Sequence, residues 1–145
     1  MFLYLLSNAA YKINLEKSIC SKIFFLNKTL FGVDAFYEVE LPDVFLFVHP
    51  IGTVLGRAKY SDYFMVYQSC NVGANHSIYP AFNEYVTLHP GASVLGKCVV
   101  GKNCDIGASS LLLDKSIEDG KIYVGNPGMF KVLDNKDSPN SIWVK

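Results

Sequence analysis

The feature that most constrains this chain is a run of six-residue blocks that begins at residue 82. The consecutive blocks read FNEYVT, LHPGAS, VLGKCV, VGKNCD and IGASSL. Their first positions are apolar: Phe82, Leu88, Val94, Val100 and Ile106. Their fifth positions are small or short: Val86, Ala92, Cys98, Cys104 and Ser110. A six-residue period is neither the 3.6-residue period of a helix nor the two-residue period of a strand, so it predicts very short strands separated by corners.

The same blocks continue upstream with interruptions. Further blocks start at Ala35, Leu41, Tyr60, Val66 and Val72. Intervals of eight, five and four residues break the period, from Phe47 to Leu55, from Leu55 to Tyr60 and from Ile78 to Phe82. We expect loops or bent corners there. Three such strands make one triangular coil of about 18 residues, and coils stack at about 4.8 Å like neighbouring strands of a sheet. The predicted fold class is therefore an all-β solenoid, whose handedness the blocks alone do not show.

Residues 1–32 follow a different pattern. Apolar residues recur at helical spacing, which predicts two short helices: Leu3, Leu6, Ala10 and Ile13 in the first, and Ile19, Ile23, Leu26 and Leu30 in the second. Gly32 marks the end of the second helix. We expect these helices to cap the open end of the solenoid. Contact with a membrane surface is the alternative, because Phe24 and Phe25 are accompanied by several lysines.

Composition excludes several classes of protein. A chain of 145 residues has the length of one ordinary domain. Its composition, 50% apolar and only 18% charged residues, argues against disorder. Thirteen basic and thirteen acidic side chains cancel, so no electrostatic footprint for nucleic acid exists. No apolar run is long enough to cross a bilayer. The four cysteines are too few for a disulfide scaffold; we expect small core residues and a cytoplasmic location.

The repeat resembles that of the hexapeptide-repeat acyltransferases, over about residues 34–132. This resemblance implies a left-handed parallel β-helix, a homotrimer, and acetyl-coenzyme A bound in the groove between subunits. No metal is expected. We predict an N-terminal helical cap at 1–32, a β-helix acyltransferase domain at 33–133 and a C-terminal tail at 134–145.

Within this superfamily, residues 33–56 are most similar to serine O-acetyltransferases. Those enzymes carry an Asp, a catalytic His fifteen residues later, and then G-x-V-[IL]-G; here Asp34, His49 and the segment GTVLG at 52–56 match. Fifteen residues is just short of one coil, so the two side chains are expected near one corner of adjacent coils. A neutral imidazole can take a hydroxyl proton near pH 7, and a carboxylate on its other nitrogen fixes the tautomer. We predict His49 as general base and Asp34 as its partner.

The resemblance also implies binding residues. His76 stands where the family has a second histidine in the acceptor site, and Gln68 resembles the Gln of a Leu-Gln-Ser segment, so both are predicted to bind the acceptor. Residues 125–132, GNPGMFKV, resemble the tail G-[NV]-P-A-[KR]-x-[IV], which lines the coenzyme groove together with small residues of the last coils. The predicted coenzyme-binding residues are Gly91, Ala108, Ser109 and Lys131. A purely structural role is the alternative for each.

Two departures from the family bear on the acceptor. Val48 replaces the Asp before the catalytic His, and Asn75 replaces the Arg before the second His. Those charges hold the amino and carboxylate groups of serine, and a zwitterion in a partly buried site needs such partners. We therefore expect an uncharged hydroxyl of a sugar or glycan precursor as the acceptor. The short N-terminal helices also resemble acetyltransferases of capsule and O-antigen clusters, which points to polysaccharide biosynthesis. A serine acetyltransferase and a non-catalytic trimeric interaction protein remain the alternatives.

Overall fold

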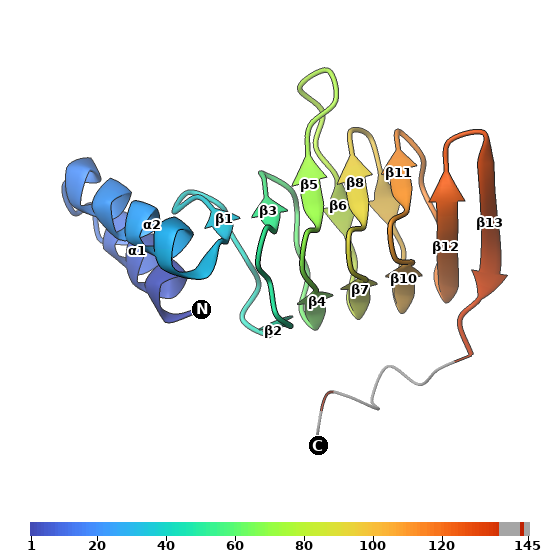
Figure 1. Cartoon of the computed structure of the whole chain (residues 1–145), viewed down its shortest axis with the longest axis horizontal. Coiled ribbons are helices and arrows are strands. Elements are labelled where there is room, and N and C mark those ends of the chain that lie inside the picture. Colours follow the sequence, from blue (N-terminus) through green and yellow to red (C-terminus); the bar gives the residue numbers. More distant parts are fainter. Residues whose placement is uncertain (137–142, 144–145) are drawn as a thin grey trace.

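The computed structural model has a pair of helices at one end and a stack of short strands behind them (Figure 1). It describes residues 1–136 and 143. Residues 137–142 and 144–145, most of the predicted tail, lie outside the described residues. The predicted fold class is confirmed: the chain is an all-β solenoid, a left-handed parallel β-helix with a short helical cap.

The strands form three sheets, one on each side of the β-helix. One sheet contains, in spatial order, β1 (Asp34–Ala35), β3 (Val54–Leu55), β5 (Asn71–Gly73), β8 (Ser93–Leu95) and β11 (Leu111–Leu113). The second contains β2 (Phe45–Phe47), β4 (Phe64–Val66), β7 (Val86–Leu88), β10 (Cys104–Ile106), β12 (Lys121–Asn126) and β13 (Met129–Asp134). The third contains β6 (Ala81–Phe82) and β9 (Val99–Val100). Pairing is parallel except in the final hairpin, β12–β13.

The strand register reproduces the six-residue period. Cys104 pairs with Val86, eighteen residues earlier, which is three blocks. Asn71 pairs with Ser93, twenty-two residues later. The longer coil accommodates a loop, residues 74–80, that projects beyond the ends of the strands (Figure 1). This loop coincides with the interruption of the period before Phe82.

Both recurring positions of the blocks point into the core. Every side chain at the first and fifth positions of the five blocks is at most 2% exposed. Small residues occupy the fifth position because three strands converge on a corner where space is short. Cys98 and Cys104 fill two of these places as free thiols, and burial raises the pKa of both. They are core residues, as the spacing predicts.

The helices α1 (Phe2–Lys12) and α2 (Lys17–Phe31) cap the open end of the β-helix through polar contacts. The Tyr4 hydroxyl donates to the Val39 carbonyl at 2.8 Å, and the Asn8 amide donates to the Tyr37 carbonyl at 2.9 Å. From α2, the Asn27 amide donates to the Val33 carbonyl at 3.3 Å. The first coil has no coil beneath it, so its carbonyls need such donors.

The apolar spacing that predicts these helices does not mark their buried faces. The buried residues of α1 are Tyr4, Ser7, Asn8 and Ala10, and those of α2 are Cys20, Phe24 and Asn27. Leu6, Ile13, Ile19, Leu26 and Leu30 are exposed instead. The unpaired carbonyl groups of the first coil require hydrogen-bond donors, and the polar side of α1 therefore faces inward. No helix in the described part of the chain is long and apolar enough to span a membrane.

Removing a first-position ring should strongly destabilise the β-helix. Phe82 is buried and stacks on Tyr60 with ring centroids 5.4 Å apart. We expect Phe82→Ala to lower the free energy of unfolding by about 3–5 kcal/mol, because the ring leaves a cavity that the stacked coils cannot close. Denaturant unfolding followed by circular dichroism measures it. Tyr79→Ala, in the exposed loop, is the control and should change stability by less than about 0.5 kcal/mol. Similar losses in both variants would contradict this packing.

Candidate active site

One corner of the β-helix collects most of the predicted site residues. It lies between the six-stranded and five-stranded sheets and is built from segments 48–53, 67–70, 89–92 and 107–110. We call these four segments the site corner. Each segment donates a main-chain hydrogen bond of 2.8–2.9 Å to the layer before it, from Gly52 to Gly32, Ser69 to Ile51, Gly91 to Gln68 and Ser109 to Pro90. The site corner thus aligns, in one column, His49, Gln68, Gly91, Ala108 and Ser109.

The backbone of the site corner is left-handed at one matching position in every layer. The φ angles at the matching position are +77° at Gly52, +56° at Ser69, +73° at Gly91 and +55° at Ser109. His49, with a φ of +49°, is a second left-handed residue in the first layer. At Gly91 a side chain would also approach Ser109, since a Cβ atom there would lie 3.4 Å from the Ser109 Oγ. Left-handed backbone costs a non-glycine residue about 1–2 kcal/mol. The recurrence at the matching position shows that left-handed backbone belongs to the corner geometry, whereas that of His49 is additional and has no counterpart in the other three layers.

The segments that carry Asp34 and His49 are stacked on each other. The Asp34 N–H donates to the Thr53 carbonyl at 2.9 Å, and Asp34 pairs with Val54 in the sheet. The Asp34 carboxylate accepts a hydrogen bond from Lys28 Nζ at 2.6 Å. Among the described residues this carboxylate makes no hydrogen bond to His49. The predicted contact between Asp34 and His49 therefore stays a prediction, and Lys28 is a competing partner that sequence reasoning missed.

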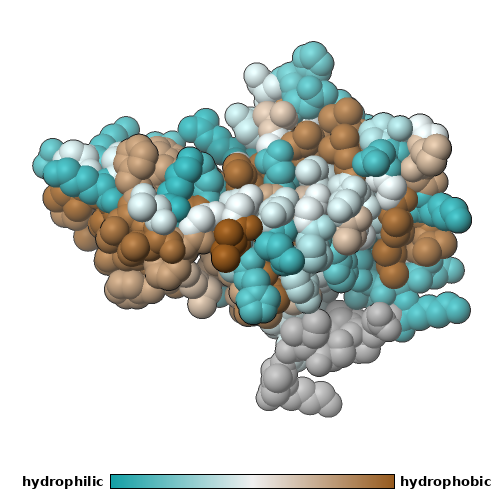
Figure 2. Space-filling view, in the orientation of Figure 1, coloured by the Kyte–Doolittle hydropathy of each residue, from teal (hydrophilic) through white to brown (hydrophobic). Residues whose placement is uncertain are grey.

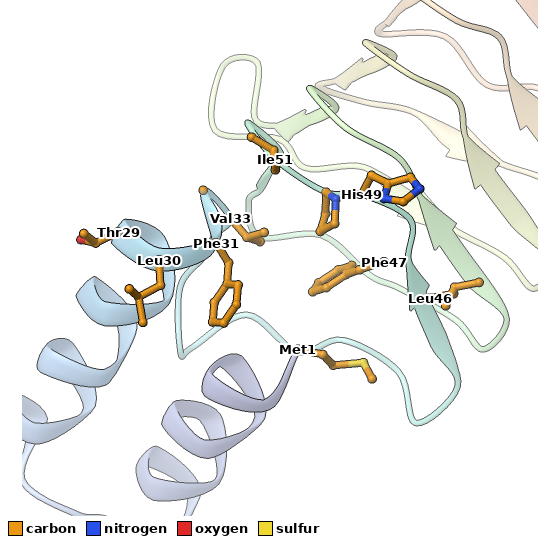
Figure 3. A pocket seen from close by; sticks show the side chains of 11 residues that line it. Met1, Thr29, Leu30, Phe31, Val33, Leu46, Phe47, His49 and Ile51 are labelled. Atoms are coloured by element: carbon orange, nitrogen blue, oxygen red, sulfur yellow. The ribbon is translucent and has the colours of Figure 1, made fainter.

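His49 lies in the wall of a pocket between the C-terminal end of α2 and the first coils. The pocket has a volume of about 620 Å³, and the rings of Phe31 and Phe47 project toward its interior (Figure 3). Its lining is mostly apolar and comprises Met1, Thr29, Leu30, Phe31, Gly32, Val33, Leu46, Phe47, His49, Pro50 and Ile51. A volume of this size is typical of small-molecule sites. His49 thus borders an apolar space, which the repeat pattern did not indicate.

Two polar side chains inside the site corner have contrasting partners. The buried Thr53 hydroxyl donates to the Tyr67 carbonyl at 2.7 Å and accepts from the Cys70 N–H at 3.2 Å. It therefore ties two layers together. The Gln68 Oε1 is buried and has no hydrogen-bond partner among the described residues. A buried acceptor without a donor costs about 1–3 kcal/mol.

His89, in the third layer of the site corner, lies between an aromatic ring and a carboxylate. Its ring stacks on Tyr67, with centroids 5.6 Å apart and planes 14° from parallel. The His89 Nε2 lies 3.4 Å from Asp105 Oδ2. Among the described residues, no group of three or more His, Cys, Asp or Glu side chains could hold a metal ion.

His76 does not lie on the site corner of its own chain. It follows β5, whereas the site corner precedes β5. It forms the tip of the projecting loop with Ser77, where φ is +48° and +62°. Asn75 and Ile78 exchange two main-chain hydrogen bonds of 3.1 and 3.0 Å across this tip. Positive φ at both central residues is the geometry of a two-residue type I′ turn.

The base of the projecting loop is anionic. Asp114 accepts hydrogen bonds from the Lys97 N–H at 2.7 Å and from the Asn75 amide at 2.6 Å. These bonds, that of Lys97 first, lower the pKa of the Asp114 carboxyl below its ordinary value. Asn75, which stands before His76, is therefore engaged with a carboxylate of its own chain.

Lys131 lies at the C-terminal end of the site corner. It is on β13 opposite Val124 and lines a second cavity of about 430 Å³ with Val124, Gly128, Met129 and Phe130. The Gly125 N–H donates to Ser110 Oγ at 3.0 Å, so the β12–β13 turn continues the column of the site corner. The predicted coenzyme residues therefore succeed one another along a single edge of the molecule.

Comparison with known proteins finds serine acetyltransferases among the relatives of this chain. No family model matches the chain. A serine acetyltransferase of Bacillus pumilus is 29% identical over 135 residues, which cover 79% of this chain and 58% of the relative. That of Synechococcus elongatus is 31% identical over 108 residues, which cover 71% of this chain and 44% of the relative. The chain thus spans about half the length of the curated relatives it matches.

Solved structures agree on the fold. A serine acetyltransferase of Neisseria gonorrhoeae matches 94% of this chain and 54% of its own, with a TM-score of 0.82 and 20% identity. A serine acetyltransferase in complex with CoA matches 90% of this chain and 54% of its own, with a TM-score of 0.78 and 22% identity. The resemblance stated from the sequence is confirmed: the chain is related to serine acetyltransferases and has the hexapeptide-repeat β-helix fold.

The charge of Asp114 should stabilise the folded chain at neutral pH. Because its pKa is lower in the folded chain, its stabilisation is present above the unfolded pKa of about 3.9 and is lost as the pH falls through the folded pKa. We expect Asp114→Asn to lower the urea midpoint at pH 7, and the difference from wild type to vanish toward about pH 2. Asp43→Asn, on an exposed side chain, is the control and should not change the midpoint at pH 7. A difference for Asp114→Asn that persisted undiminished in acid would contradict the assigned role of its charge.

Proposed function

We propose that this relative of serine acetyltransferases is an acyltransferase that transfers the acetyl group of acetyl-coenzyme A to a hydroxyl acceptor. The observation that carries the proposal is the site corner, which places His49 in the same column as the small residues Gly91, Ala108 and Ser109. Similarity to serine acetyltransferases, one of them in complex with CoA, supports it. No metal takes part in the proposed reaction.

In the proposed reaction the neutral imidazole of His49 takes the proton of the acceptor hydroxyl. The acceptor oxygen attacks the carbonyl carbon of the thioester, and a tetrahedral oxyanion forms. When the oxyanion collapses, the C–S bond breaks, and the imidazolium returns its proton to the coenzyme A thiolate. A histidine suits both steps because its ordinary pKa lies near neutrality. The products are an acetyl ester and free coenzyme A.

Asp34 is the proposed orienting partner of His49. The stacking of its segment beneath residues 52–54 brings it to the layer next to the His49 turn. To serve His49, its carboxylate must leave Lys28, whose side chain is half exposed. An ion pair with so exposed a lysine is weak, about 0–1 kcal/mol, so the exchange has little cost. The carboxylate would then hold the tautomer that presents a free nitrogen to the hydroxyl.

The coenzyme is proposed to lie along the site corner toward the β12–β13 hairpin. Gly91 and the exposed Ala108 and Ser109 leave room for a narrow pantetheine arm. Lys131 at the end of the column could meet a phosphate of the coenzyme. This placement leaves the thioester near His49.

A homotrimer completes the proposed site. His76 and the site corner lie at different corners of one chain, so a contact between them requires a neighbouring copy. In the proposed trimer the projecting loop of one subunit meets the site corner of the next, and His76 and Gln68 bind the acceptor between them. The unpartnered Gln68 Oε1 supports this role, because an acceptor hydroxyl could supply the missing donor. A cytoplasmic location and a peripheral membrane contact of the helices belong to the same proposal.

The proposed acceptor is an uncharged sugar or glycan precursor. Val48 offers no charge for an amino group, and Asn75 is hydrogen-bonded to the carboxylate of Asp114. An anion beside His76 repels the carboxylate of an amino acid. Serine remains the second candidate, because the relatives are named serine acetyltransferases. A non-catalytic β-helix that binds a partner is the third.

Replacing the proposed base should abolish acetyl transfer. We expect His49→Ala to lower kcat by about 10²- to 10⁴-fold, the usual contribution of a general base. Release of coenzyme A thiol from acetyl-coenzyme A measures the rate. The exposed His49 can be replaced without loss of core packing, so circular dichroism and oligomeric mass should not change. His76→Ala should raise KM for the acceptor more than it lowers kcat. Full activity of His49→Ala would overturn the assignment.

The acceptor class can be tested with the same assay. We expect faster thiol release with some member of a panel of sugars and nucleotide sugars than with serine at equal concentration, because neither Val48 nor Asn75 carries a charge that could hold an amino acid. A reaction without acceptor gives the background of thioester hydrolysis. Faster turnover of serine than of every sugar would favour a serine acetyltransferase. No turnover with any acceptor would favour the non-catalytic alternative.

A further inference from the structure

The outward face of α1 is apolar. Phe2, Leu5 and Leu6 of α1 and Ile13, its C-cap residue, are 41–74% exposed. They share one side of the helix because intervals of three, four and seven residues separate them. The opposite side carries the polar groups that cap the first coil. A helix that turns its apolar side to solvent is the reverse of the usual arrangement in a globular protein.

This face runs into the pocket beside His49. Leu26 and Leu30 extend it along α2, and Met1, Leu30 and Phe31 also line the pocket. Figure 2 shows the apolar side chains gathered along one side of the helical pair, with hydrophilic side chains along the opposite edge. The surface from Phe2 to the pocket is therefore one apolar region, which we call the hairpin face, and the proposed base lies at its inner end.

The charges around the hairpin face suit an anionic lipid surface. Residues 1–31 contain four lysines and a single acidic residue, Glu16. Lys12 and Lys28 are paired with Glu40 and Asp34. Lys17 and Lys22 are exposed and form no ion pair within the described residues. Helices with an apolar face and lysines beside it bind at the lipid–water interface.

We propose, on the basis of the proposed function, that the acceptor is an amphipathic lipid-linked molecule. Its hydroxyl-bearing head lies at His49, its alkyl or prenyl tail occupies the pocket, and the hairpin face rests on the lipid surface that supplies it. The mostly apolar lining provides the tail site, and a volume of about 620 Å³ accommodates a short stretch of chain. A protein partner seated in this pocket would cover the wall that holds the base, so a lipid tail is the occupant that leaves the reaction open.

Methionine methyl groups provide a readout of the pocket that is independent of activity. The chain has three methionines: Met1 lines the pocket, Met65 is buried in the sheet, and Met129 lies on the terminal hairpin. With ¹³C-methyl methionine, octyl glucoside is titrated below its micellar concentration, and methyl glucoside serves as the probe with the same head and no tail. We expect the Met1 methyl resonance to shift saturably with octyl glucoside. The dissociation constant should be at least about ten-fold lower than that for methyl glucoside. Met65 and Met129 should not shift.

Matched variants separate the pocket from general apolar binding. Phe31→Ser removes an exposed ring that lines the pocket, and Phe25→Ser removes an exposed ring that does not. Phe31→Ser should weaken octyl glucoside binding about ten-fold or more, because the tail loses the apolar surface of one ring. Phe25→Ser should leave it unchanged. Equal effects, or a shift confined to Met129, would overturn the tail site.

Vesicle flotation tests delivery from a lipid surface. Wild-type protein should float with vesicles of three parts anionic and seven parts zwitterionic phospholipid, and the double variant Phe2→Ser/Leu6→Ser should remain with the soluble fraction. Absence of flotation together with Met1 binding would restrict the acceptor to a soluble amphiphile and overturn the lipid surface. Light scattering measures the oligomeric mass of the same double variant. If that mass is lower than in wild type, and if Met1 of the wild type does not shift with octyl glucoside, the hairpin face binds a second copy of the chain and the proposal is overturned. Because neither readout uses acetyl transfer, failure here is distinct from failure of the proposed function.

Discussion

The stacking of one coil on the next is the constraint on which the rest of the structure depends. Parallel strands must stay in register over very short lengths, so every turn of the chain has to return to the same place. Residues at the site corner meet this demand with left-handed backbone and main-chain hydrogen bonds between layers. The same demand places small side chains inside the corners, while Gly91, Ala108 and Ser109 on the outside leave room for a ligand. The stacking that builds the fold therefore also positions the candidate site.

The open end of the stack explains the unusual helices. A coil with no neighbour below leaves carbonyl groups unpaired, and the side chains of Tyr4, Asn8 and Asn27 supply donors to them. Turning these donors inward places Phe2, Leu6 and Ile13 outside. The exposed apolar side is thus opposite the side that caps the first coil, and it lies beside the proposed base.

Several elements could be predicted from the residues because they follow a local rule. The blocks from Phe82 onward identify the fold, and their first and fifth positions identify the core. The alignment of His49 with Gly91, Ala108 and Ser109 follows once the coil length is known. The ion pair between Asp34 and Lys28 could not be foreseen, because it joins a helix to a strand whose relative position depends on the cap. The pocket of Phe31 and Phe47 has the same origin. The Asn75–Asp114 bond joins residues that are 39 apart, and the size of the loop between layers decides it.

The sequence by itself determined the repeat, the all-β solenoid and the candidate residues at the site corner, because a six-residue period leaves the chain only one way to bury its apolar positions. The tertiary structure alone decided which side of each helix is buried, which carboxylate each polar group meets and where an apolar pocket opens beside His49. Those outcomes depend on unpaired carbonyls at the end of the stack and on contacts between distant layers. Neither is visible in local spacing, since hydrogen-bond demand at an edge arises only when the coils are assembled.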